Sequence, residues 1–275
     1  VGKHTNIVEP THTSTTKTRT SRKTSYSDIY DQILYVGVSG LCLMMVLWIL
    51  VFPATWRAGW KWHDDQTQDF YTEAIKTTGQ YPTPLSLTTK YKGHKIAQFC
   101  HILPGCIWSG LIPFQLHPQS RKKYRKQHRY SGYLFTAVAY LMMVGYIYID
   151  VKGLIYIHSD FPNLAIDQHT THFPVHVPHE PVFRMVGVWF LITISMAVYC
   201  AMQNKFQEHR KWILRHVASG IWVAVQRIIV IVMNSKEAKD QKKTFGDGAV
   251  VGVMLTVVLA EISIYGMVGK KRKRL

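Results

Sequence analysis

The sequence has few acidic residues, few cysteines and none of the short motifs that mark common catalytic sites. Its 275 residues include 16 Asp and Glu against 33 Lys and Arg, which gives a formal net charge of +17. No two cysteines have the spacing of a zinc-ligand pair, and all of them fall inside apolar blocks: Cys42, Cys100, Cys106 and Cys200. We expect them to be small, buried apolar side chains.

The missing motifs exclude several classes of enzyme. The chain has no nucleophile elbow, no phosphate-binding glycine loop, no H-E-x-x-H and no carboxylate pair. It therefore gives no support for hydrolysis or phosphoryl transfer, and we expect a protein that is not an enzyme. No basic stretch is interleaved with aromatic residues in the manner of a base-stacking surface, so nucleic acid is not an expected partner.

Apolar blocks of about 20 residues alternate with blocks rich in Lys, Arg, His and Thr, and that length crosses the hydrocarbon core of a bilayer as a helix. The sequence thus predicts an all-α fold, a polytopic bundle in the lipid bilayer. Six transmembrane helices are expected, over residues 33–52, 96–116, 133–149, 183–202, 216–233 and 248–269. A polar, basic tail (1–32) precedes them and a basic tail (270–275) follows. Pro104 and Pro113 indicate a kinked, central second span.

The basic residues predict an orientation. Six spans put both termini and the loops 117–130 and 203–215 on one side, with 20 Lys and Arg in 65 residues. The opposite segments hold 11 in 87 residues. By the positive-inside rule the first side faces the cytosol, matrix or stroma. The composition of the N-terminal tail suits either the remains of an organellar transit region or a disordered tail.

One segment on the opposite side carries an aromatic and basic pattern. Trp60 and Trp62 stand beside Arg57 and Lys61. Tryptophan and long cationic side chains favour the boundary between bilayer and water. We expect these four residues to anchor the chain at that boundary.

Histidines lie near the ends of the predicted spans, and one interpretation of them is a haem of b type. Such a haem needs axial ligands on facing helices, and neutral imidazole is the usual choice. On the basic side, His128 can face His209 or His216. The last two are seven residues apart, on one face of a continuous helix. On the opposite side, His101 can face His179.

Two arginines fit the same interpretation. Arg129 follows His128 and Arg210 follows His209, and guanidinium groups pair well with haem propionates. The alternative is that histidines near span ends tie loops to backbone carbonyls by hydrogen bonds. The sequence leaves both interpretations open, and haem b is therefore a candidate cofactor.

A second histidine pattern suggests a metal. The segment Asp167–His179 contains H-x-x-H and H-x-x-x-H spacings, which can seat zinc or copper. Its prolines, at 174 and 178, and Pro181 beyond it oppose a helix that would align such ligands. The sequence does not assign a metal here.

Two charged residues are expected within the hydrocarbon core of the bilayer. Arg227 lies eleven residues beyond His216, about 16 Å along a helix. Glu261 lies thirteen residues into the sixth span, about 19 Å from the opposite side. In a core about 30 Å thick these depths bring the two side chains within reach of each other. We expect them to form a structural ion pair, because an unpaired charge there is costly.

Residues 94–230 resemble the family of predicted membrane proteins catalogued as domain of unknown function 2306. The resemblance lies in H-I-L-P-G at His101–Gly105, G-L-I-P-F-Q at Gly110–Gln115, H-R-Y-S-G at His128–Gly132 and H-R-K-W-I-L-R at His209–Arg215. Tyr133 stands where members often have an arginine. The resemblance implies a membrane fold and no settled activity. It singles out His101, His128, Arg129, His209, Arg210, Trp212, Arg215 and Arg227.

Three functions fit the sequence. The first is an accessory, structural subunit of a larger organellar, respiratory-type membrane complex with other membrane subunits as partners. The mitochondrial inner membrane, with the basic face towards the matrix, is the location expected for it. The second is a b-type haem electron-transfer protein. The third, a transporter, needs a polar cavity around Arg227 and Glu261, and the chain shows none of the internal repeats typical of transporters.

Overall fold

The protein is helical throughout the part that the structure describes, and six of its helices are long and apolar enough to cross a membrane. The structure is a computed structural model, described here for residues 26–79, 85–155, 173, 179–233 and 238–272. The six candidate spans are Gln32–Arg57, Lys95–Leu116, Arg125–Val151, His179–Met202, Phe206–Met233 and Gln241–Met267. The predicted all-α fold with six spans is confirmed.

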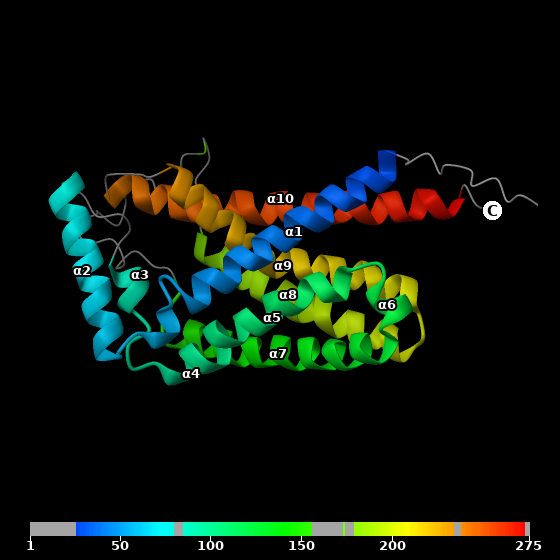
Figure 1. The fold of residues 1–275 in the computed structure, drawn as a ribbon, viewed down its shortest axis with the longest axis horizontal. Helices are drawn as coiled ribbons and strands as arrows, with labels where there is room; N and C mark the ends of the chain where they lie inside the picture. Colours follow the sequence, from blue (N-terminus) through cyan, green and yellow to red (C-terminus); the bar gives the residue numbers. More distant parts are fainter. Residues whose placement is uncertain (1–25, 80–84, 156–172, 174–178, 234–237, 273–275) are drawn as a thin grey trace, which may run out of the picture.

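The chain begins with a span and then leaves the bundle at one end. Helix α1 (Tyr26–Leu50) is followed by the short 3₁₀-helix η1 (Thr55–Arg57) and by α2 (Lys61–Thr78), which lies across that end (Figure 1). A short helix, α3 (Ser86–Thr89), leads back towards the second span.

The second span is built from three consecutive helical segments. They are α4 (Lys95–Ala97), the π-helical turn η2 (Gln98–Ile102) and α5 (Leu103–Leu116). Pro104 sits in the first turn of α5, where its missing N–H and its ring disturb the helix least after a widened turn. A short helix α6 (Ser120–Lys123) follows.

The remaining spans are long single helices. They are α7 (Arg125–Val151), α8 (His179–Met202), α9 (Phe206–Met233) and α10 (Ala238–Arg272). Both α7 and α9 begin earlier than predicted, because their first turns are polar and fall outside an apolar window. His128 and His209 therefore lie on helices, not in loops.

Five spans form a closed ring. Helix α1 packs on α5 and α9, α5 packs on α7, α7 on α8, and α8 on α9. Helix α10 lies outside this ring, mainly along α9 (Figure 1). All five ring helices contribute to one core, whose buried members include Cys42, Trp108, Phe135, Phe190 and Ile221.

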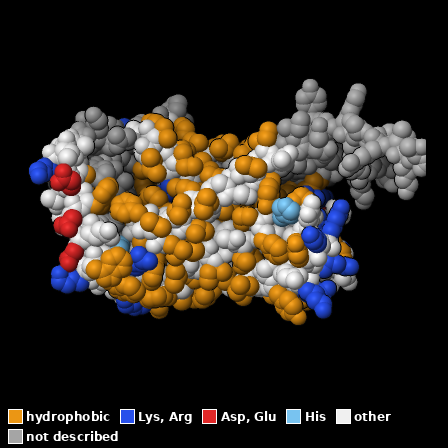
Figure 2. Space-filling model, in the orientation of Figure 1, with side chains coloured by type: hydrophobic (Ala, Val, Ile, Leu, Met, Phe, Trp, Pro, Cys, Tyr) orange, Lys and Arg blue, Asp and Glu red, His pale blue; other side chains and the backbone are white. Residues whose placement is uncertain are grey.

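The outer surface suits a bilayer. Apolar side chains cover the middle of the molecule, while Lys and Arg gather at the end that carries α6 (Figure 2). Acidic side chains in this view lie at the opposite end, over α2. Large apolar residues such as Val144 and Ile231 are more than half exposed on the spans, as lipid-facing residues are. The side of the membrane that each end faces remains a prediction.

Candidate functional site

The apolar core of the ring contains a buried histidine with polar partners. His216 on α9 is fully buried, and its ring is enclosed by those of Trp108, Phe135 and Phe190. The indole Nε1–H of Trp108 donates to Nε2 of His216 at 3.1 Å. Because Nε2 accepts, Nδ1 carries the proton and donates to the Phe190 carbonyl at 3.2 Å. The hydroxyl of Thr193 lies 3.3 Å from the same nitrogen.

His209 and His101 are held in a similar way by backbone carbonyls of neighbouring helices. The Nδ1 of His209 donates to the Ala197 carbonyl of α8 at 2.8 Å. The Nδ1 of His101, in η2, donates to the Met142 carbonyl of α7 at 2.8 Å. Gly145 permits this approach, since a Cβ there would lie 2.7 Å from the backbone of η2. His209 and His216 both face α8, as their spacing predicted.

His128 lies at the basic end, where α6 meets α7. Its Nδ1 is 3.3 Å from the Ser120 hydroxyl, and its ring lies 6.5 Å from that of Phe114. The amide of Gln115 donates to its backbone carbonyl at 3.1 Å. Arg129 next to it is exposed, and so is Arg210 beside His209.

The candidate haem ligands do not meet one another in pairs. His101, His128, His209 and His216 each contact backbone, hydroxyl or aromatic groups, and none contacts another imidazole among the residues described. His179, the suggested partner of His101, lies instead 3.3 Å from the Asp247 carboxylate of α10. His128 and His209 lie near enough to interact electrostatically, so this pair stays a candidate for a haem.

The expected ion pair between Arg227 and Glu261 is wrong. Glu261 on α10 accepts two hydrogen bonds from Arg215, from Nε at 2.6 Å and from Nη2 at 2.9 Å. Arg215 also lies over the ring of Trp212, with its guanidinium carbon 5.0 Å from the ring centroid. The pair is only partly buried, with a quarter of the Arg215 side chain and a third of the Glu261 side chain exposed.

The register of two antiparallel helices explains the correction. The Thr256 hydroxyl donates to the Ala218 carbonyl at 3.0 Å, and Gly252 lies so close to α9 that a Cβ would be 2.9 Å from the Trp222 carbonyl. This register places residue 261 beside residue 215. Arg227 lies three turns away, with its guanidinium 4.7 Å from the Phe245 ring and 5.2 Å from the Trp48 ring.

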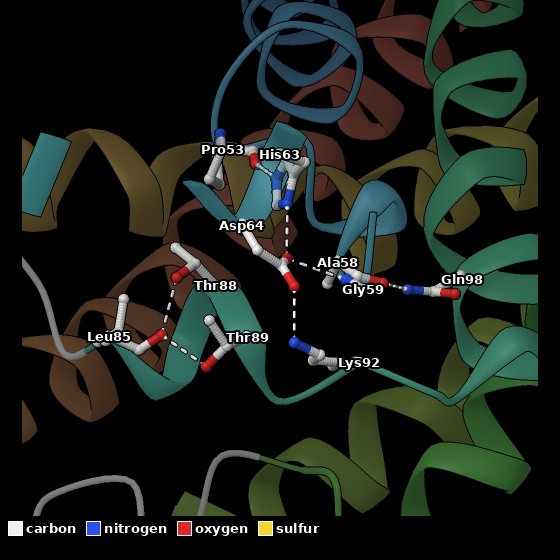
Figure 3. Close-up of polar contacts among 10 residues, drawn as sticks. All are labelled: Pro53, Ala58, Gly59, His63, Asp64, Leu85, Thr88, Thr89, Lys92 and Gln98. Atoms are coloured by element: carbon white, nitrogen blue, oxygen red, sulfur yellow. Dashed lines mark hydrogen bonds and ion pairs between the residues drawn. The ribbon is translucent and has the colours of Figure 1, made fainter. Parts of the chain in front are cut away.

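A second polar cluster fixes α2 at the opposite end (Figure 3). The Asp64 carboxylate accepts from the Gly59 N–H at 3.0 Å and pairs with Lys92 at 2.8 Å. Buried His63 donates from Nε2 to the Pro53 carbonyl at 2.8 Å. Burial alone raises the pKa of Asp64, but the hydrogen bonds from Lys92 and Gly59 and the charge of Lys92 outweigh it and hold that pKa below its ordinary value.

Sequence reasoning missed Trp108, Gln98 and the role of Arg215 as the partner of Glu261. Trp108 lies seven residues after His101, and an indole in an apolar span needs a hydrogen-bond acceptor, which is a usable signal. The family resemblance did single out Arg215, without a role. Most of the histidine-rich segment Asp167–His179 lies outside the described residues, as do His158, His169, His172 and His176. Within the described parts, no cluster of three metal-ligating side chains occurs.

Comparison with protein families gave a match over most of the membrane domain. A family model described as predicted membrane protein (DUF2306) matches residues 98–264, which is more than half of the chain. The match starts at η2 and extends into α10, so that it includes Glu261 together with its partner Arg215. A search of curated proteins found no significant match, and neither did a search of solved structures.

Proposed function

For this chain, which belongs to this family of predicted membrane proteins, we propose the role of a structural accessory subunit in a larger membrane assembly. The use of the motif side chains supports this role. His101, His209 and His216 each tie one span to its neighbour, and Arg215 ties α9 to α10. Helices in a bilayer gain no hydrophobic driving force from packing on each other, so such ties and small residues hold them together.

Helix α2 supplies the surface for a partner. His63, Thr67 and Tyr71 are buried on one side of it, and the Asp64 cluster fixes its start. Its exposed side carries two large aromatic residues, Trp62 and Phe70, and a row of acids, Asp65, Asp69 and Glu73. A helix outside the spans that is attached at its first turn and has exposed aromatic residues is suited to contact another subunit, since aromatic side chains are enriched at interfaces.

The assembly we propose is organellar, with respiratory complexes of the mitochondrial inner membrane as the first to examine. The basic, polar composition of residues 1–32 and the excess of Lys and Arg at one end support this location, with the basic end towards the matrix. The partners we propose are therefore other membrane subunits that reach α2 on the opposite side.

The experiment is to extract the protein from its native membrane in a mild detergent and to measure the mass of the particle that contains it. We expect a particle well above the 31.7 kDa of the chain. The double variant Asp69→Asn, Glu73→Gln should release the chain from that particle. The control Gln203→Lys, Gln207→Lys changes the net charge by the same amount at the other end and should leave the particle intact.

Two results would contradict the proposal. One is a particle that contains only this chain, lipid and detergent. The other is a large particle from which both double variants dissociate equally, because general charge rather than the surface of α2 would then hold it together.

A second candidate function, transmembrane electron transfer by haem b, is favoured by one observation. His101 and His209 both donate Nδ1–H to a backbone carbonyl at 2.8 Å, which leaves Nε2 as the basic nitrogen. An orienting hydrogen bond on one ring nitrogen is the usual support of a histidine that ligates a metal with the other.

A reduced-minus-oxidised visible spectrum of the purified protein tests the haem candidate. Soret and α-band changes that are lost in His209→Ala but kept in Gln207→Ala would establish haem and its ligand. A flat spectrum from protein that kept its cofactors through a mild purification would eliminate this candidate and leave the structural proposal untouched.

A further inference from the structure

Basic side chains from three helices come together at the end of the molecule that carries α6. The ring of His128, near the start of α7, lies 3.3 Å from the Ser120 hydroxyl of α6, and Arg121 is the next residue of α6. His128 lies near enough to Arg121 and to His209 of α9 to interact with both electrostatically. Lys and Arg also gather over this end of the surface (Figure 2). Arg121, His128 and His209 are called the basic cluster below, and their charges favour an anion.

The packing of α7 on α8 brings the beginning of α9 to this end. The Tyr140 hydroxyl of α7 lies 3.1 Å from the Ser195 hydroxyl of α8. From that level α7 runs back about three turns to His128, while α8 ends about two turns further on. The chain then turns into α9, whose first turn carries His209. The hydrogen bond from His209 to the Ala197 carbonyl holds this turn against α8.

The Nε2 atom of each imidazole is open to a ligand. The hydroxyl hydrogen of Ser120 is donated to the His117 carbonyl at 2.8 Å, so the hydroxyl oxygen accepts from Nδ1 of His128. Nδ1 of His209 likewise donates to a carbonyl. Within the described parts of the chain, neither Nε2 makes a hydrogen bond, and both rings are partly exposed. Neither Nε2 is enclosed by the protein, so a ligand at the surface can reach both.

The positive charge of the basic cluster is not neutralised from within the described part of the chain. Glu208, the acid that precedes His209, accepts from Lys211 at 2.7 Å. Among the described residues, Arg121 forms no ion pair, and the charges that act on His128 are both positive. An exposed guanidinium beside two imidazole lone pairs therefore suits a ligand that is anionic and also carries a hydrogen-bond donor.

The basic cluster also lies beside surfaces that contact lipid. Two candidate spans begin next to it, at Arg125 and at Phe206, so it stands at the depth of head groups. Apolar side chains on the neighbouring helices are more than half exposed, among them Tyr133, Met202 and Phe206. An anionic ligand whose apolar part lies along these helices is a phospholipid.

We infer that the basic cluster binds a phospholipid whose head group is a phosphate monoester, of the phosphatidic acid type. The Arg121 guanidinium donates to the anionic oxygens of the phosphate. The P–OH group donates to an Nε2 lone pair, which either His128 or His209 offers. The acyl chains lie along the exposed apolar side chains of α7 and α9.

The chemistry of the phosphate gives this site its selectivity. A monoester carries between one and two negative charges at neutral pH, because its second pKa is about 6. It therefore has a proton that it can share with an imidazole nitrogen. A diester has one negative charge and no P–OH group, so it can pair with Arg121 but cannot donate to Nε2.

Native mass spectrometry of the delipidated full chain in detergent tests the site. Phosphatidic acid and its methyl ester, phosphatidylmethanol, are titrated separately with identical acyl chains, and the fraction carrying one bound lipid is measured. The methyl ester remains an anion but lacks the P–OH group. We expect phosphatidic acid to bind about tenfold more tightly, which corresponds to about 1.4 kcal/mol.

Substitutions separate the two parts of the site. The double variant His128→Asn, His209→Asn keeps an N–H near the position of each Nδ1 and removes both Nε2 lone pairs, so the two lipids should bind equally. Arg121→Gln should weaken both lipids several-fold. Lys122→Gln removes the same charge from the next residue of α6, which is also exposed, and should change neither. Where the double variant reduces the yield of folded protein, the unchanged protein with both lipids and the two exposed α6 variants decide.

Three results would overturn the inference. They are equal binding of the two lipids by the unchanged protein, a preference that survives in the double variant, and equal losses in Arg121→Gln and Lys122→Gln. Inorganic phosphate, added alone, identifies the source of the anion. Its displacement of bound phosphatidic acid at millimolar concentration would mean that the site takes a free phosphate and not a lipid.

This use of His128 and His209 excludes their use as haem ligands, because a nitrogen that accepts from a phosphate cannot ligate iron. A haem spectrum that is lost in both His128→Ala and His209→Ala would therefore also overturn the inference. Lipid binding is measured on the isolated chain, so a negative result would leave the proposed role in an assembly untouched.

Discussion

The hydrogen bond between Trp108 and His216 gives a quantitative prediction. Both side chains are almost completely buried, and the N···N distance is 3.1 Å. Trp108→Phe removes the donor and leaves Nε2 of His216 without one in the dry core, which costs about 1–3 kcal/mol. The smaller ring adds about 1 kcal/mol through lost packing. We therefore expect Trp108→Phe to lower the free energy of unfolding by about 2–4 kcal/mol.

A double-mutant cycle isolates the hydrogen bond from the packing loss. His216→Leu removes the acceptor, so the later change Trp108→Phe should cost less in that background. We expect a coupling energy of about 1 kcal/mol, within the range measured for polar pairs between membrane helices. Unfolding in detergent titrated with dodecyl sulfate measures all four free energies.

The control uses an indole elsewhere in the bundle. Trp222 stacks on Phe183 with ring centroids 5.8 Å apart, so Trp222→Phe should combine additively with His216→Leu. Additive effects of Trp108→Phe and His216→Leu, within about 0.3 kcal/mol, would refute the reasoning. The central hydrogen bond would then contribute nothing to stability.

Four more predictions follow from the fold. Exchanging the charges of Arg215 and Glu261 together should restore most of the stability that either single reversal removes, measured by thermal unfolding in detergent. Gly252→Ala should destabilise the protein by about 1–3 kcal/mol, because a carbonyl of α9 lies 2.9 Å from the new Cβ. Gly110→Ala should be neutral or stabilising, since nothing lies within 4 Å there. In the unchanged protein, the backbone amides of α2 should lose protection from hydrogen exchange as the pH falls into the acid range. Asp64→Asn should abolish this pH-dependent loss.

The sign of the acid effect follows from the lowered pKa of Asp64. Burial alone raises it, but the hydrogen bonds from the Lys92 ammonium and the Gly59 N–H outweigh burial. The ionised carboxylate therefore stabilises the attachment of α2 above the unfolded value of about 3.9. This stabilisation is lost as the pH falls through the lower pKa of the folded state. Protection of α2 that stays constant down to pH 2 would contradict the assignment.

The spans could be predicted from the sequence because the bilayer sets their length and excludes charge from their centres. The same criterion explains where their ends were missed. The first turns of α7 and α9 are polar and carry His128 and His209, so an apolar window begins only after them. A helix continues through head groups as readily as through hydrocarbon, and its beginning is therefore set by local backbone geometry and not by hydropathy.

The partner of Glu261 could not be predicted from the sequence. The depth estimate assumed that each span starts at the edge of the bilayer, whereas α9 starts at Phe206, ten residues earlier than predicted. The pairing depends on the register of α9 and α10, which Gly252 and Thr256 set through contacts with the backbone of the other helix. Contacts between residues on different helices produce no periodic pattern in the sequence of either helix.

Substitution by an apolar side chain distinguishes a histidine that only holds helices together from one that binds a cofactor. A histidine that only ties two helices has an apolar substitute, because removing donor and acceptor together leaves no buried polar group unsatisfied. A histidine that ligates a cofactor has none, since no apolar side chain offers a lone pair. If His216→Leu with Trp108→Phe keeps the protein folded and in its native particle, the centre of the ring is structural. If the double variant is stable and folded but no longer assembles into the native particle, the polar side chains at the centre of the ring have a role beyond holding the spans together.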